Sequence, residues 1–382
     1  MSESAYLDDA QIERARDFRD GQRLIALVTL AVEGAVLVVI ALWRPEPARR
    51  ALAVASRRPI LGGAAVGAGL SLTLAVASLP LGAVAHERAR DVGLATQSLG
   101  PWLGDQAKAT AIATALAAAG AAAALALIRR LGRHWWLGGT AVVVAFAAIS
   151  TWLAPVLLAP LFNRFEELPP GRARSDVMRL GERSGVRIGE VYRVDASRRS
   201  TALNAYVDGL GPTKRVVLYD NLLRDAERPL LNSVVAHELG HVKADDILRG
   251  IAWVAIVAPL GVLFVQLSTE ALARRTGASP RSPAVVPALA LCLAGTSLVL
   301  GTVSNQLSRR VEARADTFAL TLTRNPAAFI ELQRQLALTN IGDPDPPAAL
   351  HWIFGTHPTT VERIGAAVAY EREHPDTGRA SD

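Results

Sequence analysis

Unbroken apolar blocks of membrane-spanning length dominate this sequence, and the charged residues lie mostly between them. A helix needs about 20 mostly apolar residues to cross the hydrocarbon core of a bilayer. Six blocks reach this length, at residues 24–43, 60–85, 109–128, 135–161, 250–268 and 283–304. They exclude a fully soluble protein and a disordered one, although the apolar fraction of 51% is itself ordinary. The sequence therefore predicts a mainly α polytopic membrane protein with about six transmembrane helices.

The number of blocks predicts which polar segments share a membrane face. The first 22 residues lack the apolar core of a signal peptide, so we expect them to remain and to face water. Four spans precede the polar segment and two follow it, which puts both termini and this segment on one face. We therefore divide the chain into residues 1–161 (tail and four helices), 162–246 (polar segment), 247–304 (two helices) and 305–382 (C-terminal segment). Arginines occur in loops on both faces, so charge bias does not fix the orientation.

Charge and cysteine content narrow the choice of partners. The formal net charge is +6, but the arginines are scattered and 35 acidic residues balance them, which argues against a nucleic-acid partner. The single cysteine, Cys292, excludes an intrachain disulfide and a cysteine-based zinc cluster. Glu33 stands near the middle of the first block. An ionisable residue there is a candidate functional residue, but we favour a polar or water-filled surrounding as its explanation.

The polar segment 162–246 has a different pattern from the apolar blocks. Residues 171–185 have the pattern of an amphipathic helix, and β-rich runs follow at residues 190–195, 202–207 and 214–219. Glycine and proline between the last two runs indicate an antiparallel pair. A helix is expected from about residue 227 to residue 245. The segment thus predicts a small sheet packed with helices.

The last of these helices contains the pattern H-E-x-x-H at His237, Glu238 and His241. Positions i and i+4 lie on one helical face, so both imidazoles can reach one metal ion at about 2.0–2.1 Å. Glu238 then lies close to a water molecule bound to that metal ion and can act as the base that takes its proton. Because the chain has only seven histidines, the pattern favours a metal site over a pair of surface histidines.

A catalytic zinc site needs a third protein ligand besides the two histidines. The best candidate is Glu312, on a helix that continues from the last apolar block on the same face as the H-E-x-x-H helix. Asp316 is four residues further along and shares that helical face. It is placed to hold a ligand histidine by its other ring nitrogen.

These residues resemble a known family. The chain is similar to the membrane zinc endopeptidases typified by the type I CAAX prenyl protease, which removes the last three residues of prenylated proteins. The likeness runs from about residue 80 to residue 365, and its segments occur in family order. They are Trp135-Trp136, residues 159–165, 195–200, 204–206 and 214–223, the H-E-x-x-H, Glu312 with Asp316, Thr356-His357-Pro358 and Arg363-Ile364.

The resemblance implies a gluzincin-like zinc peptidase domain that holds one Zn²⁺ per chain by His237, His241 and Glu312. It also implies roles for Glu238 as base and for Asp316 beside a ligand histidine. The remaining implied site residues are Asn204 and His357 near the scissile peptide, and Arg363 in support of the site. The implied fold is a ring of transmembrane helices around a chamber, capped on the cytoplasmic side. Implied partners are the lipid bilayer and peptide or protein substrates, prenylated or membrane-associated.

Alternatives to a CAAX protease stay open at this point. The eukaryotic members of this family have seven spans and longer chains. The bias towards alanine, and towards arginine over lysine, indicates a bacterial source and hence a bacterial cell membrane. A bacterium need not make prenylated substrates. A quality-control protease without prenyl specificity is therefore the first alternative. An intramembrane-cleaving protease is disfavoured, because polar residues separate the H-E-x-x-H from the next apolar block. A non-enzymatic transporter or scaffold would bind no zinc and would cleave no peptide.

Overall fold

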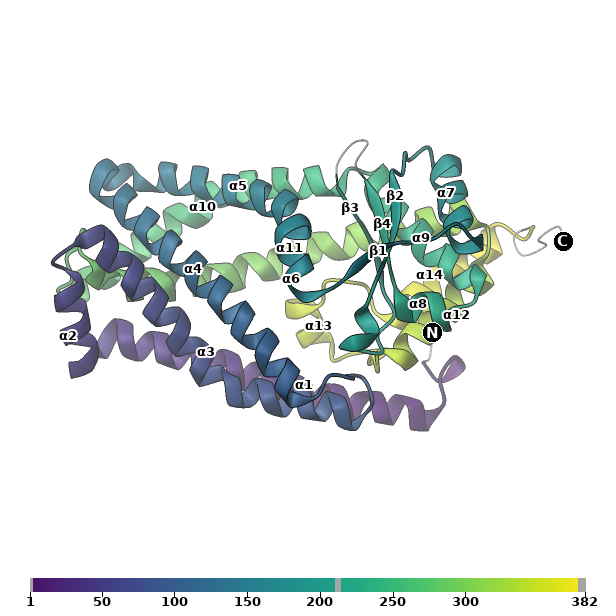
Figure 1. Cartoon of the computed structure of the whole chain (residues 1–382), viewed down its shortest axis with the longest axis horizontal. Helices are drawn as coiled ribbons and strands as arrows, with labels where there is room; N and C mark the ends of the chain where they lie inside the picture. Colours follow the sequence, from purple (N-terminus) through teal and green to yellow (C-terminus); the bar gives the residue numbers. More distant parts are fainter. Residues whose placement is uncertain (1–2, 210–213, 377–382) are drawn as a thin grey trace.

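The computed structural model describes residues 3–209 and 214–376, and helices make up most of it (Figure 1). The apolar blocks fall in long helices, several of which extend into polar sequence. These helices are α1 (Asp9–Val38), α3 (Pro59–Asp91), α4 (Leu99–Leu131), α5 (Trp135–Leu153), α10 (Asp246–Arg275) and α11 (Val286–Thr323). Shorter helical pieces connect them, namely η2 (Val39–Trp43), α2 (Glu46–Ala55), η4 (Ala154–Leu158), α6 (Ala159–Phe162) and η7 (Pro283–Val285).

The number of apolar membrane-length stretches is five rather than six, because the blocks 109–128 and 135–161 fall in one helical run, Leu99–Phe162. Within this run the chain turns at η3 (Gly132–His134). Gly132 has a φ of 55°, a conformation that favours glycine. Figure 1 shows that α4 and α5 run in different directions on either side of this turn. The run therefore contains two of the expected helices, separated by the short polar stretch at residues 129–134.

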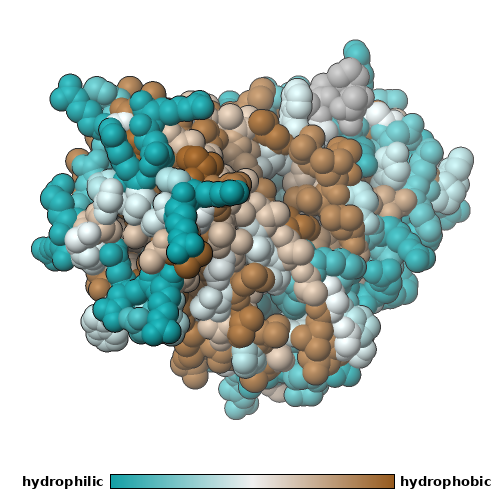
Figure 2. Space-filling view, turned by 60° about the vertical axis from the view of Figure 1, so that its left-hand side comes forward, coloured by the Kyte–Doolittle hydropathy of each residue, from teal (hydrophilic) through white to brown (hydrophobic). Residues whose placement is uncertain are grey.

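The six long helices close a ring. Each helix contacts the next in the order α1, α3, α4, α5, α10 and α11, and α11 returns to contact α1. Large apolar side chains stay exposed on these helices, as at Val76 (69% exposed) and Leu260 (74% exposed). In Figure 2, apolar side chains gather across the middle of one face, with hydrophilic residues to either side. Such a surface is too extensive for a monomer in water and is typical of a protein embedded in lipid.

Four short strands form one mixed sheet in the polar segment. They are β1 (Phe165–Glu167), β2 (Glu190–Val194), β3 (Ala205–Asp208) and β4 (Arg215–Tyr219). The order is β1-β2-β4-β3, with β2 and β4 parallel and the other two pairs antiparallel. The predicted antiparallel pair is confirmed, with Ala205 opposite Leu218. Its connection lies largely in residues 210–213, outside the described residues. Strand β1 was not predicted, and β3 occupies an edge of the sheet.

Helices pack around this sheet and bring the C-terminal segment to it. They are α7 (Arg172–Ser184), α8 (Asp220–Asp225), α9 (Arg228–Lys243), α12 (Pro326–Thr339), α13 (Ala348–Phe354) and α14 (Thr360–Glu373). The predicted helices at 171–185 and 227–245 correspond to α7 and α9. Fully buried aliphatic side chains from β2, β4 and α9, among them Val191, Leu218 and Val235, form the main core. This core fixes α9 against the sheet.

The N-terminal turns of α1 also reach this end of the molecule. Ile12 packs with Ala337 of α12, and Phe18 packs with Ile341 just beyond it. The tail, the polar segment and the C-terminal segment therefore meet at one end of the helical ring, as Figure 1 shows. Glu33 lies further along α1 and is half-buried. The four-part division of the chain stays a prediction in its boundaries.

A glycine allows the closest helix pair of the ring to form. A Cβ atom at Gly67 of α3 would lie 2.6 Å from the carbonyl oxygen of Ala117 and 2.7 Å from Cβ of Ala121, both on α4. Gly69, two residues further along α3, has nothing within 4 Å of its Cβ position. Small residues at such contacts let helix backbones approach in membranes.

We therefore expect Gly67→Val to destabilise the protein by about 1–3 kcal/mol, the usual cost of overpacking a tight contact. The melting temperature in detergent measures this effect. Gly69→Val is the matched control, since it adds the same side chain and the same helix propensity change to open space. Equal melting temperatures for the two variants would show that the α3–α4 approach does not limit stability.

Candidate active site

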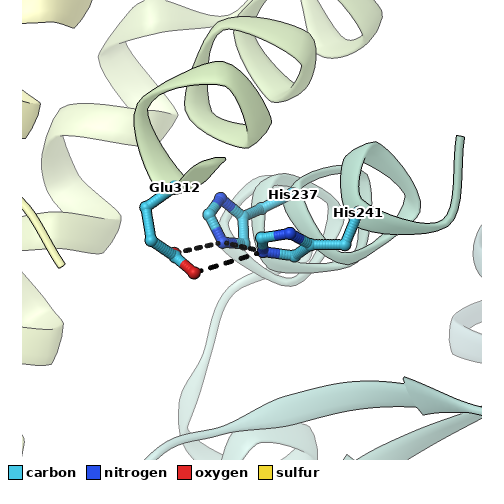
Figure 3. A group of neighbouring side chains, drawn as sticks. All are labelled: His237, His241 and Glu312. Atoms are coloured by element: carbon cyan, nitrogen blue, oxygen red, sulfur yellow. Dashed lines mark hydrogen bonds and ion pairs between the residues drawn. The ribbon is translucent and has the colours of Figure 1, made fainter. Parts of the chain in front are cut away.

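The H-E-x-x-H residues lie on α9, and Glu312 reaches them from α11. Figure 3 shows the Glu312 carboxylate pointing towards the imidazoles of His237 and His241, which project from one face of α9. One ligand atom from each residue lies within 4.8 Å of the others. These residues come from segments far apart in the sequence, and the crossing of α9 and α11 brings them together.

The distances within this group suit a tetrahedral metal ion. Ligands at about 2.0–2.1 Å from a tetrahedral ion stand roughly 3.3–3.4 Å from one another. Nε2 of His237 lies 3.1 Å from Nε2 of His241 and 3.2 Å from Oε2 of Glu312. Oε1 of Glu312 lies 3.6 Å from Nε2 of His241. The three side chains are therefore already spaced as metal ligands.

The electrostatic state of the group supports the same interpretation. Oε2 of Glu312 is buried, and its near polar neighbours are ring nitrogens of His237 at 3.2 Å and His357 at 3.4 Å. A buried carboxylate oxygen is costly unless cationic groups satisfy it. Burial lowers the pKa of His237, but hydrogen bonds with Asp316 and Glu312 outweigh burial and raise this pKa to about 9. The carboxylates thus concentrate negative potential where a cation would sit. Two imidazoles and a carboxylate fit a divalent metal ion.

Both histidines are held by carboxylates at their outer nitrogens. Nδ1 of His237 lies 2.8 Å from Oδ1 of Asp316. Arg363 of α14 forms an ion pair with the same carboxylate through two nitrogens, and its Nε donates to Oδ2 at 2.8 Å. Nδ1 of His241 lies 3.0 Å from Oδ2 of Asp246. Such contacts fix the ring orientation and the tautomer of a metal-ligating histidine.

Asp246 is a site residue that the sequence analysis missed. It begins α10, and Asp245 before it has a φ of 54°, which turns the chain back towards α9. The available signal was an acidic residue five positions after His241, but that spacing alone does not predict the turn. Arg314 forms an ion pair with the other oxygen of Asp246. The two outer carboxylates are therefore each neutralised by one arginine.

Two further titratable side chains border the group. Burial raises the pKa of the Glu238 carboxyl above its usual range, against the opposing effect of the two histidines, and a raised pKa suits a carboxylate that must accept a proton near neutral pH. Nε2 of His357 lies 3.4 Å from Oε2 of Glu312. Burial lowers the pKa of His357, so that the ring is neutral near pH 7. A neutral imidazole can still donate one hydrogen bond.

Asn204 has a different environment from the other predicted site residues. It is exposed and directly precedes the edge strand β3. Its side-chain oxygen accepts a hydrogen bond from the backbone N–H of Ala205 at 2.9 Å. Strand β3 packs against α9, which carries the histidines. The structure thus gives Asn204 a local contact, and its role near a substrate stays a prediction.

A close approach of α9 and α11 sets the spacing of the ligand atoms. A Cβ atom at Gly240 would lie 3.1 Å from Cα of Ala315 and 3.2 Å from Cβ of Phe318. Ala236 on α9 and Ala319 on α11 are fully buried in the same region. Small side chains on both helices therefore let Glu312 reach the histidines of α9.

The fold and the site define a class, the membrane metalloproteases. The features that define it are helices of membrane-spanning length, a His-His-Glu group and an adjacent half-buried glutamate. The chain belongs to peptidase family M48, whose model matches residues 170–371. A second model, described as the CAAX prenyl protease N-terminal region with five membrane helices, matches residues 4–164. The chain is thus an integral membrane metalloprotease of the CAAX protease type.

Individual relatives agree with this assignment. The uncharacterized metalloprotease YhfN of Bacillus subtilis (strain 168) is 29% identical over 321 residues, which cover 81% of this chain and 74% of the relative. A CAAX prenyl protease 1 homologue of Arabidopsis thaliana is 30% identical over 290 residues, which cover 72% of this chain but 65% of the relative. The crystal structure of S. mikatae Ste24p has the same fold, with a TM-score of 0.83 at 19% identity, over 95% of this chain and 90% of that one.

We expect Gly240→Val to separate α9 from α11 and to weaken metal binding roughly tenfold, since overpacking costs about 1–3 kcal/mol. Competition with a chelator of known affinity measures the change. Gly250→Val is the control, because nothing lies within 4 Å of a Cβ atom there. Unchanged metal affinity in Gly240→Val would show that the helix approach does not set the ligand spacing.

Proposed function

We propose that the chain is a zinc endopeptidase that hydrolyses peptide bonds at the membrane surface, with zinc bound by His237, His241 and Glu312. The observation that carries the proposal is the spacing of these three donors beside Glu238. A ligand set of two histidines and one glutamate is typical of catalytic zinc, with a fourth position left for water or substrate. A zinc ion held by these residues would supply Lewis-acid chemistry, which would lower the pKa of a water molecule and polarise the peptide carbonyl.

In this proposal Glu238 takes a proton from the attacking water and passes it to the leaving amine. Its raised pKa brings its proton affinity closer to that required near neutral pH. His357 donates a hydrogen bond to the carbonyl oxygen as negative charge develops there. It lies on the loop before α14, on the Glu312 side of the group. A preorganised donor at this point lowers the barrier because charge forms only in the transition state.

Asp316 and Arg363 act as positioning residues rather than as proton carriers. Asp316 holds the His237 ring. Arg363 neutralises the carboxylate of Asp316, so that this negative charge does not raise the pKa of the attacking water. The free edge of β3, next to Asn204, offers a place where an extended substrate adds as a further strand. Asn204 at the start of this edge would then contact the substrate backbone.

We expect Glu238→Gln to retain the bound metal and to lose about 10²- to 10⁴-fold in kcat, the usual contribution of a general base. Metal analysis of the purified variant and a peptide-cleavage assay measure the two effects. Glu331→Gln is the control, since Glu331 forms a surface ion pair with Arg334 on α12. Retained activity in Glu238→Gln would remove this residue as the base.

For the substrate we propose prenylated C-termini or membrane-associated polypeptides, with the Arabidopsis relative, named as a CAAX prenyl protease 1 homologue, as the support. The alternative is turnover of damaged membrane proteins without prenyl specificity. We expect purified protein to cleave a prenylated CAAX peptide faster than its unprenylated form, and chelator to abolish both reactions. Equal rates, together with cleavage of an unfolded membrane protein, would favour the quality-control function.

For the location we propose the bacterial cell membrane with the zinc site on the cytoplasmic side. The similarity to the Bacillus subtilis relative and the family resemblance support this proposal. A fluorescent protein fused after residue 382 tests the orientation. It fluoresces when it stays in the cytoplasm, and it does not fold after export by the general secretory route. Loss of fluorescence with normal membrane insertion would place the site outside.

A further inference from the structure

A cavity of about 780 Å³ borders the metal-binding group and has no role in the steps described above. Its walls come from α1, from α12 and α13 with the loop between them, and from the start of α14. His357 and Arg363 both line it, so it is continuous with the site. Pockets for small ligands and peptide ends measure about 300–1,000 Å³. The cavity is therefore large enough to take part of a substrate.

The wall contributed by α1 changes from polar to apolar along the helix. Its lining residues recur at spacings of three and four, which places them on one helical face. The polar ones are Arg19, Gln22 and Arg23, and the apolar ones are Ala26, Leu27 and Leu30. The occupant that suits such a cavity has one charged or polar end and an apolar body.

Arg19 is the arginine of this cavity that has no acidic partner. Arg23 pairs with Asp343 at 2.6 Å, and Arg363 pairs with Asp316. Arg19 instead donates to the backbone carbonyls of Asn340 and Ile341, the latter from Nε at 2.7 Å. Among the described residues it forms no ion pair. Two neutral acceptors thus hold the guanidinium in place, while the carboxylate of Asp343, which pairs with Arg23, acts on Arg19 only from beyond ion-pair distance.

A second donor of the cavity, unlike Arg19, has no hydrogen-bond acceptor among the described residues. Gln333 on α12 is 3% exposed, and its Nε2 has no hydrogen bond among the described residues. Gln333 lines the same cavity as Arg19. A buried N–H group without an acceptor is costly. An anionic acceptor bound in the cavity would satisfy this amide and would give Arg19 an acidic partner in direct contact.

We propose that this cavity binds the C-terminal carboxylate of the substrate, with Arg19 as its main partner and Gln333 as a second donor. The planar guanidinium matches a carboxylate in shape and charge. The apolar residues next to the carboxylate then pack against Leu27 and Leu30. The proposal rests on the proposed peptidase function, and it makes the enzyme selective for bonds near a free C-terminus.

The test compares one fluorescent peptide as the free acid and as the C-terminal amide. Binding is measured with the Glu238→Gln protein, so that turnover does not interfere, and cleavage is measured with the unaltered protein. We expect amidation to weaken binding and to raise KM by about tenfold or more, since a charge-assisted hydrogen bond is lost. We expect kcat to change little, because the carboxylate lies away from the reacting carbonyl.

Arg19→Gln tests whether Arg19 recognises the carboxylate of the peptide or only supports the fold around the cavity. We expect it to weaken binding of the free acid to the level of the amide and to leave binding of the amide unchanged. Arg14→Gln is the control, because Arg14 lies on α1 outside the cavity and donates to a backbone carbonyl of Val92. A variant that weakens both peptides equally would show that Arg19 only fastens the loop at residues 340–341, and would overturn the proposal.

The remaining outcomes distinguish the proposal from the function on which it rests. Equal binding and cleavage of acid and amide by the unaltered protein would overturn the carboxylate site and leave the peptidase function standing. Selective binding of the acid without cleavage of either peptide would support the site and contradict the peptidase function. A last peptide carries a C-terminal amide and a glutamate beside its last residue. If it binds tightly and Arg19→Gln abolishes this binding, the cavity recognises a side-chain carboxylate and its assignment to the C-terminal carboxylate is wrong.

Discussion

The close packing of α9 against α11 is the contact on which the site depends. Gly240 and the small residues around it let α11 approach until Glu312 stands within 3.6 Å of both histidine rings. α11 is also a membrane helix of the ring, so the third ligand is positioned by the same element that anchors the chain in lipid. The segment 162–246 by itself therefore carries two of the three donors and cannot complete the group.

Charge balance around the metal-binding group follows from this packing. Buried carboxylates at Glu312 and Asp316 would repel one another unless cations lie between and beside them. Arg363 balances Asp316 from the C-terminal segment, and Arg314 balances Asp246 from α11. The negative charge of Glu312 stays uncompensated by any arginine ion pair among the described residues. Glu312 is thus the carboxylate left to bind an added cation, while arginines neutralise Asp316 and Asp246.

Local spacing made part of this site predictable from the sequence. His237 and His241 share a face because the helix repeat is local, and Glu312 followed from counting spans. The contact of Arg363 with Asp316 could not be derived from spacing, since it depends on how α14 packs, and the family resemblance implied only that Arg363 supports the site. Asp246 was missed because the left-handed turn at Asp245 decides its position. Strand β1 was missed because three residues show no usable alternation.

The same difference between local sequence pattern and tertiary packing explains which parts of the fold could be predicted. Apolar blocks predicted the membrane helices, but they did not predict that two of them continue as one helical run through the short arginine-rich turn at Gly132, between α4 and α5. At the other end of the ring, the polar turns of α1 leave the apolar span and line the cavity beside the site. Two membrane helices thus supply different parts of the proposed machinery: α11 supplies the proposed third metal ligand, and α1 supplies the proposed binding surface. This division gives a physical reason for a metalloprotease to keep its active site joined to a helical ring.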